Sequence, residues 1–232
     1  MPGKDSNNHN LVNAENLYKV YQRGQEKVEA LKGVDLLLPP HSFGVVLGPS
    51  GGGKSTLLHI LGGMDRPTSG SLSINQFNLI GARETSLTSF RRDHIGFIFQ
   101  FYNLLPSLSA LDNVILPLLA KGQPPGQSRD RAKKLLDQIG LSGRINHKPG
   151  QLSGGEQQRV AIARAVIVEP VLILADEPTG DLDSKTAQEV IQLMLDLNKN
   201  LGVTFLVATH NVNISGFATH RFTMQDGQLT RD

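Results

Sequence analysis

The segment 48–56 combines glycines with one lysine and three hydroxyl side chains. Its spelling, Gly-Pro-Ser-Gly-Gly-Gly-Lys-Ser-Thr, matches the pattern G-x-x-x-x-G-K-[ST]. Glycines let a backbone curl close to a polyphosphate, so that peptide N–H groups can surround the anion. Lys54 would attract the β- and γ-phosphates, and Ser55 would offer its hydroxyl to Mg²⁺. The predicted triphosphate-binding residues are Gly48, Pro49, Ser50, Gly51, Gly52, Gly53, Lys54, Ser55 and Thr56.

Two carboxylates, Asp176 and Glu177, directly follow the apolar run 171–175. A buried strand that ends in Asp is the expected way to hold Mg²⁺ opposite a phosphate-binding loop. Glu177 would lie near the γ-phosphate, where it could orient and polarise a water molecule. A phosphate-binding loop alone would also suit a kinase, a GTPase, a helicase or a recombination ATPase, and Asp-Glu alone is often a solvated turn. Together the two motifs predict hydrolysis of ATP.

Ser153 precedes two glycines and the apolar helical run 160–168. Serine at this place caps a helix whose first turn exposes free N–H groups, which together make a second anion site. A helix cap with no further role is the plain alternative. A phosphate already held by its own loop does not need a second site in the same molecule.

Four short apolar runs supply the strands that would position these residues, at 43–47, 95–99, 171–175 and 203–208. Most of them lack alternation, which is typical of strands buried on both faces of a parallel sheet. The loop 48–56 and the acid pair each follow one of these runs. Both motifs are therefore predicted to lie at the carboxyl edge of one sheet.

Helical patterns lie between the predicted strands, which indicates an α/β fold. Apolar residues from 187 to 195 repeat at helical spacing, with Gly202 placed to end that helix. A second pattern, 132–139, has Ser128 as its expected N-cap and Gly140 as its expected terminator. Residues 1–13 are expected to form a flexible tail, and Asp226-Gly227 a terminal hairpin.

The composition excludes several classes of protein. The chain has 232 residues and a net charge of +2, which favours neither a nucleic-acid platform nor a polybasic membrane anchor. It contains no cysteine, so disulfides and cysteine-based sites are excluded. No apolar run approaches the roughly 18 residues of a spanning helix. If the protein acts at a membrane, we expect it to act from the water side.

Taken together, the motifs resemble those of the ABC ATPase family, and the resemblance covers essentially the whole chain after the tail. Leu152-Ser-Gly-Gly-Glu156 resembles the family's signature loop, which usually ends in Gln. The resemblance implies further site residues: Gln100 of the Q-loop, which would contact the metal, Asp183 of the D-loop, and the switch residue His210. Tyr21 lies where the family stacks an aromatic ring on adenine. Catalytic roles would fall to Glu177, His210 and Lys54, and metal contacts to Ser55, Gln100 and Asp176.

The resemblance also implies an architecture and an assembly. The fold would be a P-loop NTPase sheet core with an ABC-type antiparallel β-subdomain. One domain would span 14–232, with a helical subdomain inserted at about 101–160. Two copies would form a homodimer around two ATP molecules, so that Ser153, Gly154 and Gly155 bind ATP held by the other copy. Gln100 would couple the site to a membrane partner.

Segments 61–70, 91–101 and 176–180 resemble the macrolide-exporter and lipoprotein-release subfamily. This implies a permease with a large extracytoplasmic domain, an adaptor protein in some systems, and a location on the cytoplasmic face of the inner or plasma membrane. Two departures are visible: Asn211 stands where that subfamily has Asp, and His41-Ser42 where it has Gly-Glu.

Three alternatives share these motifs. A soluble ABC ATPase acting on nucleic acid usually has a coiled-coil insert or two cassettes, and neither is present here. A regulator of cell division or signalling would use the same ATPase without transport, and the sequence barely separates it from a transporter subunit. An inactive binding module is disfavoured by the intact Lys54, Ser55, Asp176, Glu177 and His210.

Overall fold

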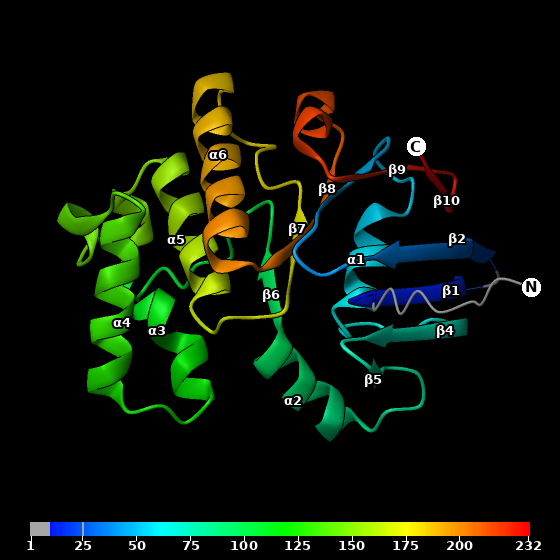
Figure 1. The fold of residues 1–232 in the computed structure, drawn as a ribbon, viewed down its shortest axis with the longest axis horizontal. Helices are drawn as coiled ribbons and strands as arrows, with labels where there is room; N and C mark the ends of the chain where they lie inside the picture. Colours follow the sequence, from blue (N-terminus) through cyan, green and yellow to red (C-terminus); the bar gives the residue numbers. More distant parts are fainter. Residues whose placement is uncertain (1–9, 25) are drawn as a thin grey trace, which may run out of the picture.

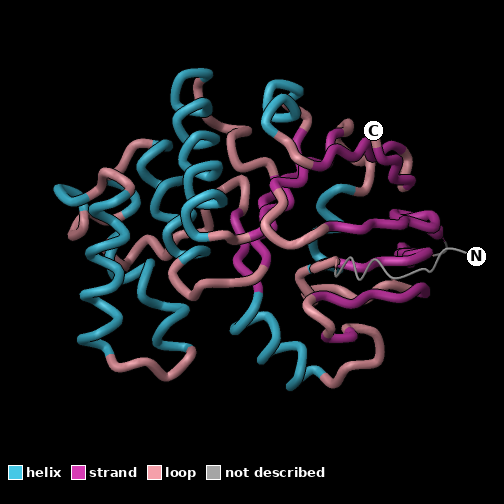
Figure 2. Tube along the Cα trace, viewed as in Figure 1, coloured by secondary structure: helices cyan, strands magenta, loops and turns pink. Residues whose placement is uncertain are grey.

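The computed structural model describes residues 10–24 and 26–232. Its described strands form two sheets, with most of the helices gathered at one end of the molecule (Figure 1, Figure 2). The first sheet has the strand order β2-β1-β4-β5, and the second β10-β9-β3-β8-β7-β6. The α/β fold class is confirmed.

The second sheet contains the four predicted strands. They are β3 (Phe43–Leu47), β6 (Ile95–Ile98), β7 (Leu172–Asp176) and β8 (Thr204–Thr209). All pair in parallel, and every residue of β8 is buried. Leu47 pairs with Thr209 and Asp176 with Ala208, so the carboxyl ends of β3, β7 and β8 meet at one edge. The predicted parallel core is confirmed.

The same sheet ends in the predicted hairpin, formed by β9 (His220–Gln225) and β10 (Gln228–Arg231). Asp226 and Gly227 turn the chain with φ of 50° and 81°, the left-handed geometry that favours this dipeptide in tight hairpins. β9 pairs in parallel with β3, which places the hairpin beside the loop 48–53.

The antiparallel sheet consists of β1 (Val12–Arg23), β2 (Glu26–Leu38), β4 (Ser69–Ile74) and β5 (Phe77–Asn78). It packs on helix α1 (Lys54–Leu61) through one shared apolar core. The prediction that the flexible tail extends to residue 13 is wrong for its last residues. Leu11 and Val12 are buried in this core, and Val12 begins β1. Residues 1–9 lie outside the described part of the chain.

Helices α3 (Ala110–Ala120), α4 (Pro125–Gln138) and α5 (Gly154–Val166) share a separate apolar core at the opposite end of the molecule (Figure 1). The predicted N-cap Ser128 is wrong. Pro124 is the N-cap of α4 and Pro125 its first residue, while Ser128 is buried one turn inside the helix. The Pro125 ring presets the helical φ, which makes this the stronger start signal. Gly140, with φ of 76°, follows the helix as predicted.

Two further helices lie in different places. Helix α2 (Glu84–His94) leads into β6, and its buried Leu87 and Phe90 belong to the core of the antiparallel sheet and α1. Helix α6 (Ser184–Leu201) packs on the parallel sheet and buries Val190, Ile191 and Met194 in the core with β7 and β8. Gly202 ends α6 in the left-handed conformation, as predicted. Short 3-10 helices at Ser142–Arg144, Pro149–Gln151 and Val212–Phe217 complete the elements of the described residues.

Candidate active site

The loop between β3 and α1 wraps so tightly that two of its glycines, Gly48 and Gly53, have no room for side chains. A Cβ on Gly48 would lie 2.1 Å from the carbonyl oxygen of Met224, and one on Gly53 would lie 2.6 Å from that of Ala30. Gly51 and Gly53 also have φ of 80° and 106°, which glycine adopts without strain. The loop ends at Lys54, the first residue of α1, so the free N–H groups of that helix point into it.

Lys54 is held inside this loop. Its ammonium donates to the carbonyl oxygens of Gly48 at 2.8 Å and Pro49 at 3.0 Å. The same nitrogen lies 3.5 Å from Oε1 of Glu177, with only 6% of the lysine side chain exposed. The predicted phosphate-binding lysine and the predicted catalytic carboxylate are therefore in direct contact.

Glu177 follows β7 with φ of 45°, a conformation uncommon for a residue other than glycine. Its N–H donates to the carbonyl oxygen of Ala208, which anchors it to the end of β8. Thr209 Oγ1 donates to its Oε2 at 2.9 Å, and Nδ1 of His210 lies 3.0 Å from its Oε1. The neighbouring ends of β7 and β8 thus bring Glu177 and His210 together.

Asp176 has the features of a ligand for a hard cation. Burial raises the pKa of its carboxyl, and a hydrogen bond from Ser55 opposes that rise. Its Oδ1 is buried and has no hydrogen-bond partner among the described residues. Carboxylate and hydroxyl oxygens suit Mg²⁺, which takes few protein ligands and completes its shell with phosphate oxygens and water. The residues present therefore fit the predicted metal.

Lys54, Ser55, Asp176 and Glu177 border one open cavity of about 1060 Å³, whereas His210 does not line it. The predicted residues that line it are Tyr21, Ser50, Gly51, Gly53, Lys54, Ser55, Thr56, Gln100, Asp176 and Glu177. Gln100 donates to Oδ1 of Asp181 at 3.4 Å, which connects the Q-loop to the segment before α6. Sequence reasoning missed Thr209, Glu29, Lys32 and Asp226. Of these four, only Thr209 could have been predicted from the sequence, because it lies at a strand end beside His210.

The signature residues do not line this cavity. Ser153 caps α5: its hydroxyl accepts from Glu156 N–H at 3.2 Å, and its own N–H donates to Glu156 Oε2 at 2.8 Å. A Cβ on Gly155 would lie 2.4 Å from the Thr186 methyl group, and one on Gly154 would lie 3.0 Å from the Tyr102 hydroxyl. Asp183 is also outside the cavity and caps α6. The two predicted phosphate-binding features therefore lie in separate places within one copy of the chain.

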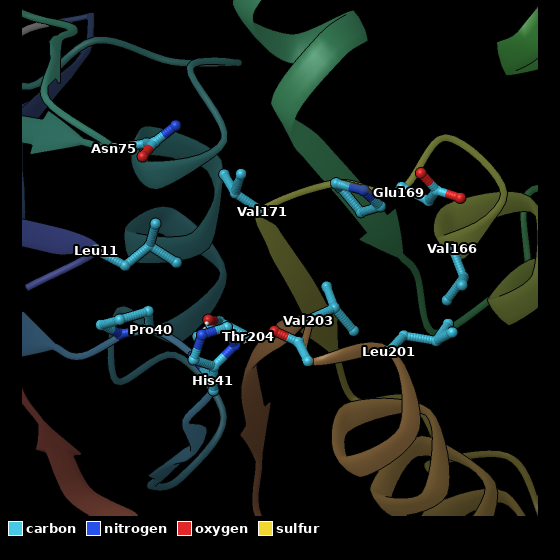
Figure 3. Close-up of a pocket in the computed structure, with 12 residues that line it drawn as sticks. Leu11, Pro40, His41, Asn75, Val166, Glu169, Val171, Leu201, Val203 and Thr204 are labelled. Atoms are coloured by element: carbon cyan, nitrogen blue, oxygen red, sulfur yellow. Dashed lines mark hydrogen bonds between the residues drawn. The ribbon is translucent and has the colours of Figure 1, made fainter.

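A second cavity, of about 280 Å³, lies at the opposite edge of the sheet, where β7 and β8 begin (Figure 3). Apolar side chains such as Leu11, Val171 and Val203 form much of its wall, and Glu169 lies at its side. It lacks the lysine and the free helix N–H groups that mark the first cavity. We therefore assign the phosphate chemistry to the first cavity alone.

Comparison with known proteins gives the same result as this geometry. Residues 31–180 match the family model described as ABC transporter. The chain belongs to the ABC transporter family. It is 43% identical over 219 residues to the lipoprotein-releasing system ATP-binding protein LolD of Syntrophus aciditrophicus, covering 94% of this chain and 98% of that protein. It is 47% identical over 213 residues to an uncharacterized ABC transporter ATP-binding protein of Thermotoga maritima, covering 92% and 91%.

A solved structure has the same fold. The dimeric ATP-binding cassette MJ0796, in a post-hydrolysis state with ADP and Pi, superposes with a TM-score of 0.88 at 43% identity and covers 95% of this chain and 97% of that one. As a member of this family, the chain is an ATP-binding ATPase, as predicted. No helix in residues 10–24 and 26–232 is both long and apolar enough to span a bilayer.

Proposed function

We propose that this chain is the ATPase subunit of a lipoprotein-release type transporter. One observation carries the proposal: the loop around Lys54 and the helix capped by Ser153 are both built for phosphate, yet only the first borders the cavity. A triphosphate that uses both must lie between two copies of the chain. ATP binding would then close a homodimer, and loss of the γ-phosphate on hydrolysis would let the two copies separate.

The geometry supports a sequence of contacts during hydrolysis. A γ-phosphate at Lys54 would compete with Glu177 for the ammonium, because the two groups lie 3.5 Å apart. Glu177 would then hold the attacking water, oriented by its hydrogen bonds from Thr209 and His210. Ser153, Gly154 and Gly155 of the partner copy would complete the phosphate shell, and Asp183 would lie near the same interface.

Ser55, Asp176 and Gln100 would hold Mg²⁺ beside the phosphates. The bound ion supplies charge neutralisation for the β- and γ-oxygens. The remaining site residues act on the nucleotide itself: Gly48 to Thr56 surround the phosphates, Tyr21 stacks on the base, and His210 contacts the γ-phosphate.

ATP hydrolysis would drive a membrane permease with a large extracytoplasmic domain. In some systems an adaptor protein would join this complex. The similarity to LolD supports this assignment, and it would place the chain on the cytoplasmic face of the inner membrane. Phe101, which follows Gln100, leaves 72% of its surface exposed and offers the permease an apolar contact next to the metal site. The helical subdomain would comprise about residues 101–160.

Two measurements test the proposal. The ATPase rate per chain should fall on dilution, because the site needs two copies, and the chain should co-purify with a permease whose lipoprotein release in vesicles requires ATP. The shared site would be contradicted if the rate per chain stayed constant on dilution to chain concentrations far below those at which the dimer forms. A permease complex that hydrolyses ATP but releases no lipoprotein would contradict the transport role.

A further inference from the structure

Tyr21 is held by residues that lie outside the cavity. Its hydroxyl donates to Oδ2 of Asp65 at 2.6 Å, and the ammonium of Lys19 lies 4.7 Å from the centre of its ring. Tyr21 itself lines the cavity, whereas Lys19 and Asp65 do not. The ring is thus fixed by charged groups on one side and borders the nucleotide cavity on another.

Asp65 uses both of its carboxylate oxygens in this arrangement. Oδ1 accepts from the Lys19 ammonium at 2.6 Å and from the Arg66 N–H at 2.7 Å, while Oδ2 accepts from Tyr21. Burial acts to raise the pKa of Asp65, but the hydrogen bonds from Lys19, Tyr21 and Arg66 lower it overall. The carboxylate is therefore charged at neutral pH, and its bonds to Lys19 and Tyr21 are charge-assisted.

Asp65 also connects Tyr21 to the phosphate-binding loop. Its N–H donates to the carbonyl oxygen of His59, in the last turn of α1, and α1 begins at Lys54. Thr68, three residues further on, binds β1 through its own N–H and through its hydroxyl. The Tyr21 ring is therefore tied to α1, which begins at Lys54, through the segment 62–68, and hydrogen bonds anchor this segment to α1 at one end and to β1 at the other.

We propose that Asp65 and Lys19 are positioning residues that hold Tyr21 as a stacking platform for the base of the nucleotide. This inference rests on the proposed function, in which the cavity binds ATP. A ring that is already fixed loses less conformational freedom when a base stacks on it, and this pre-organisation increases affinity. The platform would contact only the base. It would therefore strengthen the binding of ATP and leave the binding of a bare triphosphate unchanged.

The test measures the dissociation constants of ATP and of inorganic tripolyphosphate, with Mg²⁺, by calorimetry on full-length variants. Asp65→Asn should weaken ATP binding by about tenfold, the scale of one charge-assisted hydrogen bond, and should not change tripolyphosphate binding. Lys19→Met should act in the same direction. In ATPase assays, KM for ATP should rise in both variants while kcat stays near the wild-type value.

Two further variants keep the test decisive. Tyr21→Phe keeps the ring and removes only the hydroxyl, so the double variant Tyr21→Phe/Asp65→Asn should lose less ATP affinity than the two single effects combined. Asp35→Asn is the matched control, because Asp35 accepts a hydrogen bond from Asn16 N–H in the same antiparallel sheet but does not line the cavity. It should leave both ligands unaffected.

Each outcome decides the inference. Equal weakening of ATP and tripolyphosphate in Asp65→Asn would show that Asp65 acts on the phosphate-binding loop and would overturn it. Unchanged ATP affinity in both Asp65→Asn and Lys19→Met would overturn it as well. If the wild-type chain binds tripolyphosphate and ATP equally, Tyr21 has no part in binding. If it binds neither, the proposed function itself fails.

Discussion

The Lys54 ammonium lies 3.5 Å from Oε1 of Glu177, and both side chains are largely buried. The lysine belongs to the phosphate-binding loop, and the glutamate is expected to act on the attacking water. A triphosphate that takes the lysine releases a carboxylate which is still bound by Thr209 and His210. Under the proposed function, phosphate binding and preparation of the base would therefore be one event in this site.

Glu177→Gln should separate nucleotide binding from turnover. The amide keeps the size of the side chain but cannot take a proton from water, so the ATPase rate should fall by about 10² to 10⁴-fold. ATP should still bind, and the variant should accumulate as a dimer. Gel filtration with and without ATP, together with a phosphate-release assay, measures both effects. A variant that hydrolyses ATP at the wild-type rate would remove Glu177 from its role.

Lys54→Ala should lose ATP binding. It removes the charge that meets the phosphates and leaves the Glu177 carboxylate, only 14% exposed, without its cationic partner. Filter binding with labelled ATP measures the loss. Lys27→Ala is a suitable control, because Lys27 lies on β2 and does not line the cavity. Unchanged ATP affinity in Lys54→Ala would contradict the assignment of the loop.

Asp176 should make the stability of the folded chain depend on pH. Because burial raises the pKa of this carboxyl, the folded state keeps a proton there at pH values where the unfolded state has lost it. Its contribution to stability is therefore most favourable below the ordinary carboxyl pKa and falls as pH rises through the raised value. Asp176→Asn should remove this dependence, melt higher than the wild type at neutral pH, and lose Mg²⁺-dependent ATPase activity.

Thermal melts of both proteins between about pH 4 and 8, with and without Mg²⁺, test this prediction. Mg²⁺ with nucleotide should raise the melting temperature of the wild type more at the higher pH, because the ion competes with the proton for Asp176. A wild type whose melting temperature follows that of Asp176→Asn at every pH would contradict the shifted pKa.

Gln158, on α5, is fully buried, and neither polar atom of its amide has a partner among the described residues. Replacing an unsatisfied buried amide by an apolar group should be stabilising, so Gln158→Leu should raise the free energy of unfolding by about 1–2 kcal/mol. Asn113 is the matched contrast, since its amide bonds the Leu105 N–H and three carbonyl groups. Asn113→Leu should cost about 2–3 kcal/mol. Urea denaturation measures both, and a destabilised Gln158→Leu variant would contradict this reading.

Features set by local sequence could be predicted best. The loop 48–56 can form because Gly48 and Gly53 lie where a side chain would collide with backbone carbonyl oxygens, and the strand 171–175 carries Asp176 to the sheet edge by its own apolar pattern. The site contacts that were missed, such as Asp65 with Tyr21, join residues 44 positions apart. No local pattern encodes such a contact, because it depends on how β1 packs beside the end of α1.

The errors have similar causes. The polar residues that precede Leu11 and Val12 predict a tail, whereas pairing of Val12 with β2 and β4 draws both residues into the core. The spacing of Ser128 before the apolar pattern predicts a helix cap, but Pro125 begins the helix about one turn earlier. In both cases tertiary packing or a stronger local signal outweighed the pattern that was used.

The central claim is that each ATP lies between Lys54 of one copy and Ser153 of the other. Mixing Ser153→Arg chains with Lys54→Ala chains tests it most directly, since every mixed dimer then holds one intact site. Each variant alone should be inactive, and an equal mixture should recover about a quarter of the wild-type ATPase rate, because half of the dimers are mixed. A Ser153→Arg chain that hydrolyses ATP at full rate alone, or a mixture no more active than its components, would contradict the shared site.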